Sequence, residues 1–129
     1  MNFVTDTHAL VWWFTDSPKL GKKAVKVFTD CELGENIIVI PSIVLAEALS
    51  IFDKKRVAFD FRKLFKQVRD SENFVIMALD YPVLETMLEL KNLPELHDKI
   101  IVATAKHLEL PLITKDTTLQ KLSTIRTIW

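Results

Sequence analysis

Two patterns of hydrophobic and polar positions alternate along the chain. Short runs rich in β-branched and aromatic residues predict strands at residues 2–5, 36–40, 74–79, 111–114 and 126–129. Between them, apolar residues recur at helical spacing and predict helices at residues 7–14, 18–31, 42–53, 57–70, 82–92 and 98–108. Strands that alternate with helices are typical of an α/β domain. We therefore expect a central, mostly parallel sheet of about five strands, flanked by helices on both faces.

Turn and capping residues support several of these boundaries. Ser17 precedes Pro18 at the predicted start of the second helix, and Asp80 stands two residues before Pro82 at the start of another. Pro94 separates the last two helical segments. No repeat, low-complexity tract or linker interrupts the pattern, so we expect one domain over residues 1–129.

The composition limits the classes of function. The chain has 129 residues, of which 49% are hydrophobic, which is enough for one compact core. Its 17 basic and 17 acidic side chains cancel, so any polyanion must be bound by a local arrangement. Cys31 is the only cysteine, which excludes an internal disulfide and a multi-cysteine zinc site. No apolar run approaches the roughly 20 residues that span a bilayer, and we expect a cytoplasmic protein without a membrane partner.

Two aspartates follow predicted strands. Asp6 comes directly after residues 2–5, and Asp116 follows residues 111–114 by two positions. In an open parallel sheet, ligands bind beyond the carboxyl ends of the strands, especially where the strand order reverses. If these two strands are neighbours, the carboxylates of Asp6 and Asp116 converge at one edge of the sheet.

Two further acids belong to helices. Asp98 opens the predicted helix at 98–108, which is apolar enough to pack on the sheet and to direct its amino end toward the same edge. Glu47 shares a helical stripe with Val44, Ala48 and Ile51. A carboxylate in such apolar surroundings is costly unless a cation or another partner offsets its charge.

Each acid also has an ordinary structural explanation. Asp6 and Asp98 would serve as helix N-caps, Asp116 as a turn residue, and Glu47 as a side chain that reaches water from the edge of its stripe. Together, however, four acids at one edge repel one another unless a cation is bound or a proton is shared. Oxygen ligands without a cysteine or histidine set favour Mg²⁺ or Mn²⁺ over zinc or copper.

Four segments also resemble a known family. Phe3-Val4-Thr5-Asp6-Thr7-His8-Ala9-Leu10, Ser42-Ile43-Val44-Leu45-Ala46-Glu47, His97-Asp98-Lys99-Ile100-Ile101 and Leu112-Ile113-Thr114-Lys115-Asp116 are similar, in order, to the four acidic motifs of PIN domains. Among these the chain looks most like the VapC-type toxins of bacterial and archaeal toxin–antitoxin pairs. The resemblance covers almost the whole chain.

The resemblance implies a PIN-like fold and a Mg²⁺- or Mn²⁺-dependent endoribonuclease. Asp6, Glu47, Asp98 and Asp116 take the metal-site positions, and Thr114 takes the hydroxyl position before the last acid. A water activated by the metal would attack phosphorus in line and leave 5′-phosphate and 3′-hydroxyl ends. The implied partners are an RNA substrate, a cognate antitoxin protein and a second copy of the chain in a homodimer.

Details of substrate contact are less well defined. Lys115 and Lys99 stand where the family more often has arginine or another polar residue, and Leu119 leaves no extra acid after Asp116. Candidate substrate-binding residues are Lys115, Lys99, His97, Lys54, Lys55 and Arg56. Thr7 and Thr114 are candidates to hydrogen-bond the acids, although cap and strand roles explain them nearly as well.

A basic stretch runs from Lys54 through Arg69. One interpretation is a solvated helix face with Phe61, Leu64, Phe65 and Val68 turned inward, and the other is a strip that contacts phosphates. Trp12 and Trp13 are adjacent on a helix, so both cannot face the core; one covers a dimer seam or partner groove, or is simply half exposed.

Alternative functions use the same residues. A metal-dependent phosphatase or a DNA nuclease would need the same acids, whereas a catalytically silent PIN-like module would bind only RNA or protein. The retention of all four acids disfavours the silent module.

Overall fold

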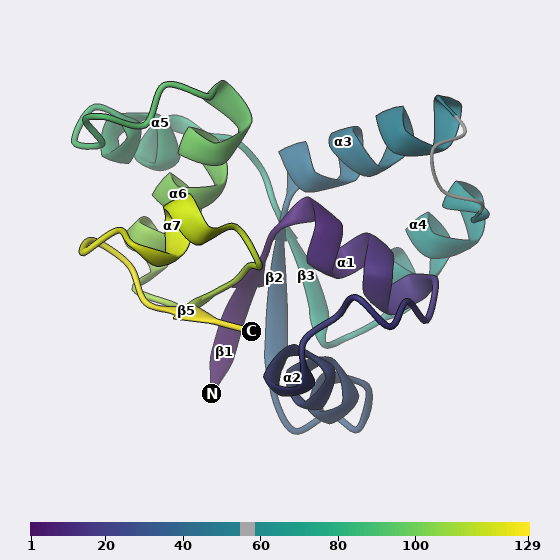
Figure 1. Cartoon of the computed structure of the whole chain (residues 1–129). Coiled ribbons are helices and arrows are strands. Elements are labelled where there is room, and N and C mark those ends of the chain that lie inside the picture. Colours follow the sequence, from purple (N-terminus) through teal and green to yellow (C-terminus); the bar gives the residue numbers. More distant parts are fainter. Residues whose placement is uncertain (55–58) are drawn as a thin grey trace.

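The computed structural model describes residues 1–54 and 59–129 and has a five-stranded sheet at its centre (Figure 1). All strand pairs are parallel, and the strand order is β3-β2-β1-β4-β5. The strands are β1 (Asn2–Thr5), β2 (Ile37–Pro41), β3 (Phe74–Met77), β4 (Leu112–Ile113) and β5 (Thr127–Ile128). The predicted sheet is thus confirmed, with every strand parallel rather than most of them.

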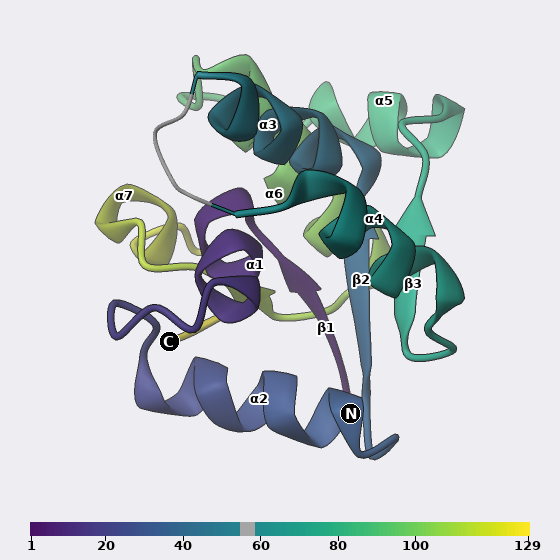
Figure 2. The ribbon, with the colours of Figure 1, turned by 90° about the vertical axis from the view of Figure 1, so that its right-hand side faces the viewer.

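Helices cover both faces of this sheet, as expected. They are α1 (Thr7–Phe14), α2 (Lys22–Glu32), α3 (Ser42–Asp53), α4 (Phe61–Asp70), α5 (Tyr81–Met87), α6 (Leu96–Leu108) and α7 (Thr117–Gln120). Figure 1 shows α5, α6 and α7 on one side of the strands and α1, α2 and α4 on the other. Figure 2, turned by 90°, shows α3 lying beyond the carboxyl end of β2, near the amino end of α1. Among the described residues, no helix combines the length and the apolar character needed to cross a membrane.

The strand order reverses next to the central strand. The chain runs from β1 outward through β2 to β3, and then returns to place β4 on the other side of β1. Val4 pairs with Leu112, and Thr5 pairs with Ile113. The crevice between the carboxyl ends of β1 and β4 is therefore the topological switch point at which ligands bind in open α/β sheets.

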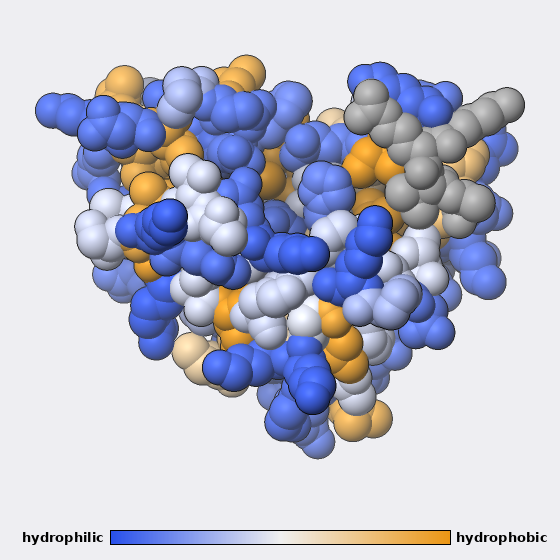
Figure 3. All heavy atoms as spheres, in the orientation of Figure 1, coloured by the Kyte–Doolittle hydropathy of each residue, from blue (hydrophilic) through white to orange (hydrophobic). Residues whose placement is uncertain are grey.

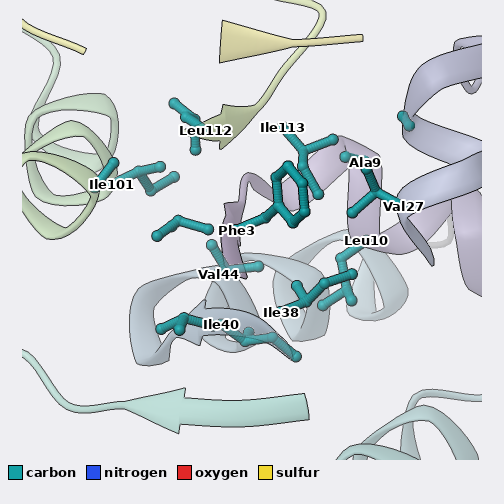
Figure 4. Packing of buried hydrophobic residues seen from close by; sticks show 14 of the residues in the cluster. Phe3, Ala9, Leu10, Val27, Ile38, Ile40, Val44, Ile101, Leu112 and Ile113 are labelled. Carbon is teal, nitrogen blue, oxygen red and sulfur yellow. The ribbon is translucent and has the colours of Figure 1, made fainter. Parts of the chain in front are cut away.

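The hydrophobic core packs on both faces of β1 and β2 (Figure 4). Val4 and Ile38 are fully buried within the sheet, and Leu10 of α1 and Val44 of α3 are fully buried against it. On α6, Ile101 and its buried neighbours face the sheet, which confirms that this apolar helix packs there. Each such side chain contributes roughly 1.5–3 kcal/mol by leaving water. This packing fixes the amino end of α6 near the switch point.

Two predicted helix starts were wrong. The second helix begins at Lys22 rather than at 18, because the Ser17 hydroxyl accepts a hydrogen bond from the Lys19 amide and closes a turn. The fourth helix begins at Phe61, with the Asp60 side chain accepting from the amides of Arg62 and Lys63 as its cap. Positions 57 and 58 of the prediction lie outside the described residues.

Three other boundaries differ from the prediction by two residues or more. α5 ends at Met87 rather than at 92, and β3 ends at Met77 rather than at 79. α6 begins two residues earlier than expected, because Glu95 rather than Asp98 is its N-cap. The single-turn helix α7 was not predicted, since four residues are too few to show a helical period.

Aromatic residues account for much of the packing on the α1, α2 and α4 side. Trp13 stacks on Phe28 with 5.3 Å between ring centroids and donates from Nε1 to Glu32. On α4, Leu64 and Val68 are buried as predicted, but Phe65 is exposed and stacks on Phe61. The expectation that Phe65 faces inward was therefore wrong. Phe65 follows the buried Leu64 by one residue, so its side chain points away from the core and packs on the Phe61 ring.

Candidate metal centre

One pocket of about 520 Å³ gathers all four predicted carboxylates. Asp6, Glu47, Asp98 and Asp116 line it together with Thr7 and Lys115, and we call this site the acidic pocket. Its acids come from the end of β1, from α3, from the first turn of α6 and from the segment after β4. Figure 3 shows hydrophilic residues gathered across the middle of this face, between α6 and α7 on one side and α1 and α3 on the other. The convergence expected from strand order is confirmed for Asp6 and Asp116.

Asp6 and Asp116 each cap a helix while lining the acidic pocket. Oδ1 of Asp6 accepts from the amide of Ala9 at the start of α1. Oδ1 of Asp116 accepts from the amides of Thr118 and Leu119 at the start of α7. Asp6 is therefore a helix cap as its structural explanation held, whereas Asp116, expected as a turn residue, caps α7 instead. Each cap accounts for only one oxygen of the carboxylate. The caps also fix the two side chains at the edge of the sheet.

Asp98 has no capping role. The Glu95 side chain caps α6 by accepting from the Asp98 amide through Oε2, at 2.7 Å. The capping explanation for Asp98 was thus wrong, because the helix begins before it. Its half-buried side chain lies in the first helical turn and lines the acidic pocket. A carboxylate in a first turn is also favoured by the positive end of the helix dipole.

Glu47 is held by neutral and basic partners from other elements. The buried Thr7 hydroxyl donates to Oε1 of Glu47 at 2.6 Å. Nδ1 of His97 lies 3.2 Å from Oε2 of Glu47 and 3.3 Å from Oε1 of Glu95. These contacts link α3 to α1 and to the amino end of α6. They provide the offsetting partners that the apolar stripe around Glu47 required.

Thr114 contacts both of the aspartates that follow β1 and β4. Its side chain is fully buried, and its hydroxyl accepts from the Asp116 amide at 3.1 Å. Burial raises the pKa of Asp6, and a hydrogen bond with the Thr114 side chain opposes that rise. The Ala9 amide and His8 act in the same direction as Thr114, whereas Asp116 adds to the rise. Thr114 thus hydrogen-bonds at both aspartates, as one of its two interpretations held.

The acidic pocket disfavours a full set of negative charges. Burial, followed by the carboxylates of Glu95, Asp116, Glu47 and Asp6 in that order, raises the pKa of Asp98 to about 6. Desolvation and like charges are the ordinary causes of such a shift. The site therefore has a deficit of positive charge at neutral pH, and a bound cation would relieve it.

The donor set suits a hard divalent cation. In residues 1–54 and 59–129, no three His, Cys, Asp or Glu side chains already stand close enough to enclose a metal ion. Magnesium keeps several of its waters and takes only one or two carboxylates directly, so it does not require a complete protein cage. The oxygen donors of Asp6, Asp98 and Asp116 fit Mg²⁺ or Mn²⁺ by their chemistry.

The other predicted substrate residues fall into three groups. Lys115 lines the acidic pocket, and Lys54 and His97 line an adjoining pocket of about 440 Å³ that shares Thr7 and Glu47 with it. Lys99 lines neither pocket. Lys55 and Arg56 lie outside the described residues.

Sequence reasoning gave Trp12, His8 and Glu95 no part in this site. Trp12 and His8 line the acidic pocket, with their ring centroids 5.4 Å apart. Their spacing of four residues on α1 was an available signal, because positions i and i+4 lie on the same helix face. Glu95 was missed because nothing in the sequence distinguishes it from Asp98 as the cap of α6.

Comparisons with known proteins agree with this architecture. A family model described as PIN domain matches residues 3–124. A comparison with curated proteins finds no significant match.

Three solved structures share the fold. A chain in the crystal structure of VapBC2 from Rickettsia felis, bound to a DNA fragment from their promoter, has a TM-score of 0.72 and 17% identity, covering 99% of this chain and 98% of that one. A chain of a toxin-antitoxin complex from Klebsiella pneumoniae has a TM-score of 0.66 and 21% identity, and the match covers 98% of this chain and 95% of that one. A chain of FitAcB from Neisseria gonorrhoeae has a TM-score of 0.68 and 18% identity, and the match covers 98% of this chain and 96% of that one. At these identities the likeness concerns the fold.

Proposed function

This chain belongs to the PIN-domain family, and on that premise we propose that it is a Mg²⁺- or Mn²⁺-dependent endoribonuclease that acts in the acidic pocket. The observation that carries the proposal is the convergence of four carboxylates from separate elements on one pocket at the switch point of the sheet. PIN domains are typically nucleases, and such enzymes need clustered oxygen ligands. In this proposal the whole of residues 1–129 acts as one PIN domain.

The four acids have different roles in this proposal. Asp6, Asp98 and Asp116 hold the cation directly or through water, while Glu47 holds a second ion or orients the attacking water. When bound, the cation supplies a Lewis acid that activates water and offsets charge on the phosphate. Thr7 and His97 fix the Glu47 carboxylate, and Thr114 fixes the segment that carries Asp116. Cleavage then leaves 5′-phosphate and 3′-hydroxyl ends.

Cleavage of a 5′-labelled structured RNA in Mg²⁺ or Mn²⁺ tests the proposal. We expect a chelator to abolish cleavage and Asp98→Asn to lower kcat/KM by at least about 100-fold, since metal stabilisation of the transition state is worth several kcal/mol. Asp80→Asn is the matched control, because Asp80 is exposed and lies at the N-cap of α5, where Asn serves equally well. It should leave the rate unchanged.

Other outcomes would select other functions. Turnover of a small phosphomonoester without cleavage of RNA would make the protein a phosphatase, and cleavage of DNA alone would make it a DNA nuclease. If RNA is bound but remains intact in every divalent cation tested, the chain is a silent binding module and the nuclease proposal is wrong.

We further propose that the protein is the toxin of a VapBC-type toxin–antitoxin pair in the cytoplasm. The support is that structures of similar fold contain VapBC2 and a toxin-antitoxin complex. A neighbouring gene for a small DNA-binding protein, whose product binds this chain and blocks RNA cleavage, is the expected finding. Growth that is unaffected by expression of the active protein would contradict the assignment as a toxin.

A homodimer is part of the same proposal. Its support is a series of exposed hydrophobic side chains on β3, the loop after it and α5: Val75, Ile76, Leu79, Tyr81, Leu84 and Leu88. Leu88 has 83% of its surface exposed, which is unusual for a large apolar residue outside an interface. Sedimentation analysis should give the mass of two chains, and Leu84→Lys with Leu88→Lys should give the mass of one.

A further inference from the structure

The acidic pocket poses an electrostatic problem for its proposed substrate. Its lining carries four carboxylates, and Lys115 is the only lysine or arginine among the described residues that line it. The chain as a whole contributes no net positive charge, with 17 basic and 17 acidic residues. An RNA backbone can approach such a pocket only if cations are concentrated at its mouth.

Trp12 brings two such cations together. Nζ of Lys115 lies 5.6 Å from the centroid of the Trp12 ring, and Nζ of Lys19 lies 5.8 Å from it. Both distances are within the range at which an aromatic ring attracts an ammonium group. The two lysines are far apart in sequence, one in the turn after α1 and the other directly before Asp116. The indole and Lys115 both line the acidic pocket, and the same ring holds Lys19 beside it.

The two ammonium groups are available to a ligand. Lys19 and Lys115 are both exposed, and neither takes part in an ion pair with a carboxylate within the described part of the chain. The Lys115 ammonium lies over the Trp12 ring and forms no ion pair with Asp116, although Asp116 is the next residue in the sequence. A lysine ammonium that packs on an aromatic ring, rather than pairing with a carboxylate, remains able to bind a phosphate.

The Trp12 ring is itself held in position. The Trp129 ring packs edge-on against it, with 5.8 Å between centroids. Trp129 in turn lies against Gly21, where a Cβ atom would come within 2.6 Å of its ring. His8 contacts Trp12 from the preceding turn of α1. The indole is thus a fixed support rather than a mobile surface side chain.

We propose that Trp12, Lys19 and Lys115 form a phosphate clamp that binds backbone phosphodiesters of single-stranded RNA next to the one cleaved in the acidic pocket. The inference rests on the proposed nuclease function and adds the site at which the flanking strand is held. Trp12 is a positioning residue here, and the two lysines contact the substrate.

Salt dependence of RNA binding measures the clamp directly. The probe is a fluorescein-labelled single-stranded 12-mer RNA of mixed sequence, bound to the full chain carrying Asp98→Asn in a series of NaCl concentrations. We expect Lys19→Ala and Lys115→Ala each to weaken binding by about three- to tenfold and to reduce the slope of log K against log[salt] by about 0.7, the value for one phosphate contact on a single strand. Lys91→Ala, at an exposed lysine between α5 and α6, is the control and should change neither quantity.

Substitution of the ring separates positioning from simple packing. Trp12→Leu should lower the slope of log K against log[salt] as far as removal of a lysine does. Trp12→Phe keeps an aromatic ring and should lower this slope less. Lys115→Ala should have little further effect in the Trp12→Leu background, because the two changes remove the same contact. In the active protein, Lys19→Ala should raise KM and leave kcat within about twofold.

Three results would overturn the clamp. Unchanged salt slopes in both lysine variants would remove it while leaving the nuclease proposal intact, provided that the parent chain cleaves RNA. A loss of affinity in Trp12→Leu at constant slope, which disappears with an abasic RNA, would identify Trp12 as a base-stacking surface instead. A parent chain that neither binds nor cleaves RNA would defeat both proposals.

Discussion

The Thr7 hydroxyl donates a 2.6 Å hydrogen bond to Oε1 of Glu47 and so ties the first turn of α1 to the middle of α3. Removing a hydrogen bond that orients a metal-site carboxylate typically costs 10- to 100-fold in affinity or activity. We therefore expect Thr7→Val to lower Mn²⁺ affinity and RNA cleavage by about that factor. Calorimetric titration of Mn²⁺ and initial rates of cleavage measure the two effects.

Thr104→Val is the matched control for this change. Its hydroxyl is also buried but bonds to the Ile100 carbonyl within α6. The two variants should lose similar stability, and only Thr7→Val should lose metal affinity. Equal Mn²⁺ affinity in both variants would show that the hydrogen bond from Thr7 does not affect the contribution of Glu47 to metal binding.

Glu95 both caps α6 and raises the pKa of Asp98. Glu95→Gln keeps an oxygen that can accept from the Asp98 amide but removes the negative charge, whereas Glu95→Ala removes both. We expect the pKa of Asp98 to fall from about 6 toward its usual value in both variants. Only Glu95→Ala should lose about 1 kcal/mol of stability through the missing cap. Carboxyl NMR titration and urea unfolding test the two halves of this prediction, and an unchanged titration of Asp98 would contradict it.

Stability in the absence of metal should fall as the pH rises from about 4 to about 6. The pKa of Asp98 is raised to about 6 in the folded chain from 3.8, chiefly by burial, so between these values the folded state binds more protons than the unfolded state. By linkage, folding becomes less favourable with increasing pH over this window, and the loss is complete above it.

Asp98→Asn should remove that loss. With chelator present at pH 7 we expect its Tm to exceed that of the parent chain by about 2–4 °C, which corresponds to about 1 kcal/mol or less at a partly exposed site. The difference should vanish well below pH 3.8, where the carboxyl is protonated in both states. Asp80→Asn should show no such pH-dependent gain, and a lower Tm for Asp98→Asn at pH 7 would refute the prediction.

Gly21→Ala should destabilise the fold. A Cβ at this position would lie 2.6 Å from the Trp129 ring and 2.7 Å from its backbone carbonyl, so the neighbouring chain must shift. Forcing extra atoms into a packed site typically costs about 1–3 kcal/mol. Thermal unfolding measures this loss. Gly34→Asn is the comparison, because Asn tolerates the positive φ of Gly34 and its nearest neighbour is 3.6 Å away. An equal Tm for both variants would contradict the tight contact at Gly21.

Several features of this protein follow from local sequence. Strand β1 and helices α1 and α3 have the predicted bounds, because the hydrophobic pattern of each was read correctly from neighbouring residues alone. The positions of Asp6 and Asp116 after strands also followed from the sequence, since the polar residue that ends a buried run marks the edge of a sheet. The starts of α2 and α4 did not, because the hydroxyl of Ser17 and the carboxylate of Asp60 decide them through local hydrogen bonds to backbone amides.

The sequence by itself determined the strands and every helix except α7, and it placed Asp6 and Asp116 after strands. Only the tertiary structure decided that Thr7 and His97 hold Glu47, and that Lys115 joins Lys19 at the Trp12 ring. The physical reason is the sequence separation over which each kind of interaction acts. Hydrophobic periodicity and capping act within a few residues along the chain, whereas these contacts join residues far apart in sequence that meet only after α1, α3 and α6 have packed on the sheet.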